Sequence, residues 1–110
     1  MTINLIQKGL ELTPAIKAYV EEKMQALEKY LVDVDFMDVE VGMTTHHHQK
    51  GDVFFCKVNV NYLSELLHVE EERADLYEAI DCAKDTLKET ILRNKDRLKD
   101  KRKEGAEETI

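Results

Sequence analysis

The stretch Asp75-Leu76-Tyr77-Glu78-Ala79-Ile80-Asp81 opens the segment that decides this fold. From Asp75 to Lys103 the chain contains neither Gly nor Pro, and its apolar residues recur at helical spacing. We therefore predict one amphipathic helix of about 29 residues, which is roughly 43 Å long. A small domain cannot cover a helix of that length, and its last part, Arg93 to Lys103, carries seven basic residues. This part is expected to project from the domain as a basic rod.

Four strands and a shorter helix are predicted ahead of the long helix. Alternation of apolar and polar residues indicates the strands, which are placed at Thr2–Lys8, Phe36–Thr44, Val53–Tyr62 and Leu66–Glu72. Thr13 followed by Pro14 is typical of a helix start, and apolar residues at helical spacing extend this helix to about Leu31. Asp75 is expected to cap the long helix, with Glu78 completing a pair that resembles a capping box.

The order of these elements, β-α-β-β-β-α, predicts the fold class. The last three strands are close enough in sequence to form an antiparallel meander. The helix between the first two strands favours a right-handed parallel crossover. Because each strand has one polar face, both helices should cover the same side of the sheet. We predict an α+β two-layer sandwich with a four-stranded mixed sheet, comprising one domain at 1–103 and a charged flexible tail at 104–110.

Composition limits the compartment and the chemistry. No apolar run approaches the roughly 20 residues of a membrane span, and the N-terminus lacks the apolar stretch of a signal peptide, so a cytoplasmic protein is expected. Cys56 and Cys82 form neither a disulfide framework nor a zinc pattern. A surface loop explains His46-His47-His48 better than a metal site does. With no nucleophile motif, phosphate loop or paired catalytic carboxylates, we expect no enzyme, no cofactor and no metal.

The net charge of −7 argues against nucleic acid unless the basic residues share a surface. On a helical wheel, one flank of the long helix holds its basic residues within about 60°, namely Lys84, Lys88, Lys95, Lys99 and Arg102. The buried stripe is assigned to Tyr77, Ile80, Leu87, Ile91 and Leu98. This flank fits phosphate binding, but the charge pattern alone favours a solvated helix with local ion pairs, such as Asp81 with Lys84.

Two further residues leave alternatives open. Lys23 lies near the apolar edge of the first helix, where its chain either covers the rim of the core or leans toward the long helix. Phe55 lies on the sheet face opposite Phe54 and Tyr62, where an exposed ring would be free to stack on a base. Packing is the better interpretation for Phe54 and Tyr62, which share the predicted core face.

The chain resembles the ribosome hibernation promoting factors, a family that includes ribosome-associated inhibitor A and the sigma-factor modulation proteins. The similarity covers Met1 to about Arg102 and lies above all in Leu67-His68-Val69-Glu70-Glu71-Glu72 followed by Asp75-Leu76-Tyr77-Glu78-Ala79-Ile80-Asp81. The second of these stretches is its most specific part. It implies a short-type family member that binds the small ribosomal subunit and its ribosomal RNA in the channel for messenger RNA and tRNA. It also implies inhibition of translation without catalysis, and no membrane or small-molecule partner.

The resemblance favours phosphate binding over the solvated helix. The residues expected to face RNA are Lys23, Lys29, Lys84, Lys88, Arg93, Lys95, Arg97 and Lys99. The chain departs from the usual basic residues of the family at Ala26, Thr86 and Glu89. The first alternative is therefore a domain of this fold with weakened RNA binding that contacts a protein through its acidic faces. The second is an enzyme of unrecognised type, which no residue set supports.

Overall fold

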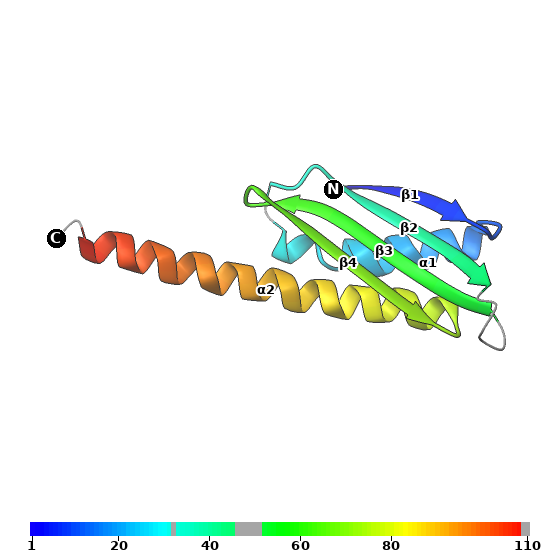
Figure 1. Ribbon diagram of the computed structural model, residues 1–110. Helices are drawn as coiled ribbons and strands as arrows, with labels where there is room; N and C mark the ends of the chain where they lie inside the picture. The colour runs from blue at the N-terminus through cyan, green and yellow to red at the C-terminus, as the bar shows by residue number, and fades with distance from the viewer. Residues whose placement is uncertain (32, 46–51, 109–110) are drawn as a thin grey trace.

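The computed structural model describes the backbone at 1–31, 33–45 and 52–108, and the side chains at 1–31, 33–44 and 53–94. The elements, in chain order, are β1 (Thr2–Lys8), α1 (Pro14–Gln25), the 3₁₀ turn η1 (Glu28–Tyr30), β2 (Phe36–Thr45), β3 (Asp52–Tyr62), β4 (Glu65–Arg73) and α2 (Leu76–Glu108). Both helices lie on one face of the sheet, and the C-terminal half of α2 projects beyond it (Figure 1). The predicted α+β sandwich with β-α-β-β-β-α order is confirmed.

The sheet has the order β1-β2-β3-β4. β1 pairs with β2 in parallel, with Leu5 opposite Val39. β2 with β3 and β3 with β4 are antiparallel, and Val58 lies opposite Val39 on one side and Val69 on the other. Because side chains alternate along each strand, this register brings the apolar residues of all four strands to the face covered by the helices.

The core fills the space between the sheet and the helices. Fully burying one Val, Leu, Ile or Met side chain contributes about 1.5–3 kcal/mol to folding, so this layer supplies most of the driving force. The helices and their connection to β2 contribute Val20, Met24, Leu27, Leu31, Leu76, Ala79, Ile80, Ala83, Leu87 and Ile91. The sheet contributes Met37, Val39, Val41, Cys56, Val58, Val60, Tyr62, Leu67 and Val69.

The first helix is shorter than predicted. Its start is as expected, because the Thr13 hydroxyl accepts a hydrogen bond from the backbone N–H of Ile16 at 3.2 Å. It ends at Gln25 rather than near Leu31. There the hydrogen bonds shorten to the 3₁₀ pattern, with the N–H of Leu27 donating to the carbonyl of Met24 at 3.0 Å. Leu27 and Leu31 are nevertheless buried, so their spacing reports the core and not the helix length.

The long helix begins as predicted, and it ends later. The Asp75 carboxylate accepts from the backbone N–H of Tyr77 at 3.4 Å, and the Asp75 carbonyl accepts from the N–H of Ala79 at 3.0 Å. α2 continues to Glu108, past the expected end at Lys103. The division into a domain at 1–103 and a tail at 104–110 stays a prediction.

A two-residue loop joins β3 to β4. Tyr62 and Glu65 are paired, and Leu63 and Ser64 between them have φ values of 53° and 66°. Two successive positive φ values are typical of a type I′ turn, which favours Asn and Gly. Leu63 and Ser64 therefore hold this turn at a steric cost.

Candidate nucleic-acid interface

The side chains of α1 and α2 meet in a polar and aromatic cluster at the solvent-exposed edge of the core. The Tyr19 hydroxyl of α1 donates to Oδ1 of Asp81 on α2 at 2.6 Å. The two tyrosine rings, Tyr19 and Tyr77, pack edge to face with 4.8 Å between centroids. Lys23 Nζ lies 5.3 Å from the centre of the Tyr19 ring and 4.0 Å from Asp81 Oδ1. Lys23 thus leans toward α2, the second of its two predicted positions.

A second cluster forms about Tyr30, at the end of η1. Lys29 Nζ lies 5.2 Å from the centre of the Tyr30 ring, and Lys88 Nζ, from α2, lies 5.5 Å from it. Burial raises the pKa of the Tyr30 phenol, but hydrogen bonding to Lys88 and the positive charges of Lys29 and Lys88 outweigh it, so the pKa falls below its usual value. Two lysines separated by 59 positions in sequence therefore act on one ring and generate positive potential there.

Lys84 lies between these clusters on α2, three residues after Asp81 and four before Lys88, which places the three residues on one side of the helix. Among the described side chains, Lys29, Lys84 and Lys88 pair with no carboxylate. The acid beside Lys29, Glu28, is 3.2 Å from the amine of Met1. We call the surface formed by Lys23, Lys29, Lys84 and Lys88 the lysine seam.

The other predicted RNA-facing residues lie further along α2. Arg93 is exposed and lies 4.0 Å from Glu89, about 140° around the helix axis from Lys88. It therefore lies off the seam. The backbone of α2 continues through Lys95, Arg97 and Lys99, whose side chains fall outside the described part. By helical spacing, the positions of Lys95 and Lys99 continue the line of Lys88, whereas Arg97 is on the opposite side.

Thr86 and Glu89, two positions where the family usually has a basic residue, also lie outside the lysine seam. The Thr86 hydroxyl donates to Glu71 of β4 at 2.9 Å, on the side of α2 that faces the sheet edge. Glu89 pairs with Arg93 on the solvent side. Neither residue removes a charge from the lysine seam.

The structure corrects the placement of Tyr77. The helical wheel assigned it to the buried stripe, yet it is 40% exposed and packs against Tyr19. The predicted Ile80, Leu87 and Ile91 are buried, and Leu76, Ala79 and Ala83 are buried with them. The side chain of Leu98 lies outside the described part. Sequence reasoning also missed the roles of Tyr19 and Tyr30. One signal was present, because Tyr19 and Lys23 are four residues apart and so share a helix face.

The opposite face of the sheet is acidic. Lys57 Nζ lies 3.8 Å from both Glu40 and Glu70. It also lies 5.0 Å from the centre of the Phe55 ring, which is only 4% exposed. The ring lies over Gly42, where an added Cβ would approach it to 2.4 Å. Phe55 is thus covered and not free to stack on a base.

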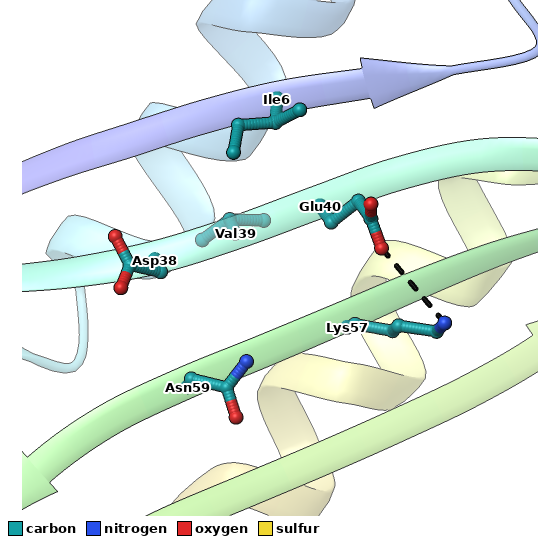
Figure 2. Close-up of a pocket in the computed structure, with 6 residues that line it drawn as sticks. All are labelled: Ile6, Asp38, Val39, Glu40, Lys57 and Asn59. Carbon is teal, nitrogen blue, oxygen red and sulfur yellow. Dashed lines mark ion pairs between the residues drawn. The ribbon is translucent and has the colours of Figure 1, made fainter.

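A shallow pocket opens on this acidic face, with a volume of about 330 Å³. Figure 2 shows Glu40 pointing toward Lys57 across neighbouring strands, with Ile6 on β1. The residues that line this pocket are Ile6, Asp38, Val39, Glu40, Lys57 and Asn59.

Within residues 1–31, 33–45 and 52–108, no group of three His, Cys, Asp or Glu residues is placed to hold a metal ion. His46, His47 and His48 lie outside the described residues. Burial raises the pKa of the Cys56 thiol to about 12, so this thiol stays protonated.

Over the described positions, no helix has the length and apolar character needed to cross a membrane.

Several known proteins are similar to this chain in sequence, and others in fold. The chain is 30% identical over 111 residues to a ribosome hibernation promotion factor of Deinococcus radiodurans, covering 97% of this chain and 56% of that protein. A second such factor, from Bacillus subtilis, is 30% identical over 104 residues, covering 94% and 53%. The chain thus spans about half the length of these curated relatives.

Two solved structures have the same architecture. The crystal structure of the Thermus thermophilus Protein Y N-terminal domain matches with a TM-score of 0.67 and 36% identity, covering 84% of this chain and 98% of that one. A ribosomal subunit interface protein from Coxiella burnetii matches with a TM-score of 0.73 over 87% and 99%, and at 15% identity it supports the fold alone. Residues 3–99 match the family described as sigma 54 modulation protein / S30EA ribosomal protein, and this chain belongs to that family.

Proposed function

We propose that this chain is a ribosome hibernation factor that binds the small ribosomal subunit and its ribosomal RNA in the channel for messenger RNA and tRNA. Its relatives named ribosome hibernation promotion factor support a role on the ribosome. The mechanism is occupancy, because a domain in that channel excludes the ligands of translation. No catalytic step is part of it.

The observation that carries the proposal is the lysine seam. Three of its cations lack a carboxylate partner among the described side chains, and two of them, Lys29 and Lys88, converge on Tyr30. Binding to RNA is driven largely by neutralising phosphates and releasing their counterions. A local group of unpaired cations supplies that potential even though the chain carries a net charge of −7. Phosphate contacts from lysines would position the domain on folded RNA.

Arg93, Lys95, Arg97 and Lys99 remain part of the proposed contact surface, as the projecting end of α2. Lys95 and Lys99 extend the line of the lysine seam by helical spacing, so they are the better candidates. Arg93 and Arg97 would contact RNA only where it wraps around the helix.

Sedimentation with purified ribosomal subunits tests this function. We expect the protein to move with the small subunit at low salt and to dissociate as salt rises, and not to move with the large subunit. Subunits already loaded with messenger RNA and tRNA should bind less of it, and cell-free translation should slow as it is added. Equal binding to loaded and empty subunits would exclude the channel as the binding site.

The acidic sheet face supports a second candidate, a protein-interaction module. Asp38 and Glu40 line the shallow pocket together with Ile6, whose side chain is 56% exposed, and Glu70 pairs with Lys57 of the same pocket. Such a surface suits a basic protein segment. Under this alternative, the protein would not move with the small subunit even at low salt.

A further inference from the structure

The carboxylate of Asp81 lies among the lysines of the lysine seam. Asp81 lies on the same side of α2 as Lys84 and Lys88, and its side chain is 46% exposed. A surface that only binds phosphates gains nothing from a carboxylate, which repels them. Asp81 holds Tyr19 and lies near Lys23, but nearly half of its side chain stays exposed beside the phosphate-binding lysines.

The contacts of Asp81 leave it able to accept more hydrogen bonds. Tyr19 donates to Oδ1 at 2.6 Å, and Lys23 is 4.0 Å from the same oxygen. Among the described side chains, none donates to Oδ2. An ionised carboxylate has about four lone-pair positions, and it only accepts. The side chain is 46% exposed, so this unused capacity is accessible to solvent, and the bond from Tyr19 fixes the position of the carboxylate.

An aromatic ring lies beside this carboxylate. Tyr77 precedes Asp81 by four residues, so the two side chains are neighbours on α2. The Tyr77 ring is held edge to face by Tyr19 at 4.8 Å and is 40% exposed. An exposed ring next to a fixed acceptor is the arrangement by which proteins stack a splayed base and read its edge.

We propose that Asp81 and Tyr77 form a base-reading subsite for an unpaired guanine, flanked by the phosphate-binding lysine seam. Guanine presents two adjacent donors, N1–H and the N2 amine, which match the two oxygens of a carboxylate. Adenine and cytosine place an acceptor beside their single amine, and uracil flanks its one donor with carbonyls. This inference rests on the proposed RNA binding and adds the class of RNA: a single-stranded segment containing guanine.

Short RNA oligomers test the base preference directly. The full chain would be titrated, by fluorescence anisotropy at low salt, into uridine nonamers with guanosine, inosine, adenosine or cytidine at the centre. The guanosine oligomer should bind about fivefold tighter or more than those with adenosine or cytidine, the lower end of the discrimination given by one bidentate pair. Inosine lacks the N2 amine and should fall between them. Equal affinity for all four oligomers would overturn the subsite.

Asp81→Asn separates base reading from simple charge. Asparagine still accepts from Tyr19, but the negative charge is lost and an amine replaces one acceptor. We expect this variant to lose the guanosine preference and to bind the small subunit less tightly than the unchanged chain. Asp85→Asn, the same change on an exposed carboxylate four residues further along α2, should retain both. If Asp81→Asn strengthens binding to every oligomer and to the subunit, Asp81 is only a repulsive charge and the inference fails.

The oligomer titration and the subunit sedimentation together distinguish a failure of the guanine subsite from a failure of the proposed function. Binding to the small subunit without any base preference leaves the proposed function standing and removes the subsite. Failure to bind the small subunit at all contradicts the proposed function and the subsite together.

Discussion

The hydrogen bond from Tyr19 to Asp81 has a measurable consequence for proton affinity. Accepting this bond and carrying a negative charge, Asp81 is the main cause that raises the pKa of Tyr19 from 10.0 to about 12. Between these two values the folded chain keeps a proton that the unfolded chain has lost. The stabilisation is therefore complete below about pH 10 and is lost as the pH rises through about 12.

Removing the charge of Asp81 should lower the pKa of Tyr19 toward that of a free tyrosine. In an ultraviolet absorbance titration of the Asp81→Asn variant, we expect the transition of Tyr19 to shift to lower pH. Tyr19→Phe is the matched control, because it should delete that same transition. A titration curve unchanged by Asp81→Asn would mean that Asp81 does not hold the Tyr19 proton.

Single residues also show how far sequence could predict the site. Lys84 and Lys88 were found on one flank because a helical wheel needs only their spacing. Tyr30 could not be found that way, because its ring meets Lys88 through packing between segments far apart in sequence. Tyr77 was misplaced because an aromatic residue at the edge of an apolar stripe has the spacing of a core residue, while its exposure depends on where α1 packs.

The elements were predictable to different degrees. The strands were placed within one residue at each end, because alternation of side chains stops where the pairing stops. The end of α1 was misjudged because Leu27 and Leu31 keep the helical apolar spacing while the backbone tightens into η1. Apolar spacing indicates which side chains enter the core, but either an α-helix or a 3₁₀ turn can place them there.

The loop between β3 and β4 offers a stability test. Replacing Leu63 with Asn and Ser64 with Gly should raise the free energy of unfolding by roughly 1 kcal/mol, because these residues tolerate the positive φ values that the turn requires. Urea denaturation would measure the gain. Leu63→Ala with Ser64→Ala keeps a Cβ at both positions and should give no gain. An equal gain from this alanine pair would show that backbone strain is not the cause.

The rotation of side chains about α2 gives a prediction for its projecting end. Reversing the charge of Lys95 and Lys99 together should weaken binding to the small subunit by roughly tenfold for each lost charge-assisted contact. Reversing Arg93 and Arg97 should cost less, because Arg93 lies about 140° from the line of Lys88. Sedimentation of both double variants at one salt concentration makes the comparison. A larger loss from the arginine pair would place the RNA on the other side of the helix.

At the scale of the whole molecule, the lysine seam and the acidic sheet face lie on different sides. The outer face of the sheet carries Glu40 and Glu70 about Lys57, whereas the lysine seam lies where both helices meet solvent. A chain with a net charge of −7 is thus expected to approach RNA in one orientation, with its acidic sheet turned away.

The most direct test of this account is the salt dependence of small-subunit binding after charge reversal at Lys29 and Lys88. The double variant should bind more weakly, and the slope of log affinity against log salt should become shallower by about 2, one unit for each lost phosphate contact. Lys17→Glu, on the exposed surface of α1 about 120° from Lys23, should leave both quantities unchanged. Unaltered affinity and slope in the Lys29 and Lys88 variant, with its circular dichroism still that of the folded chain, would contradict the account.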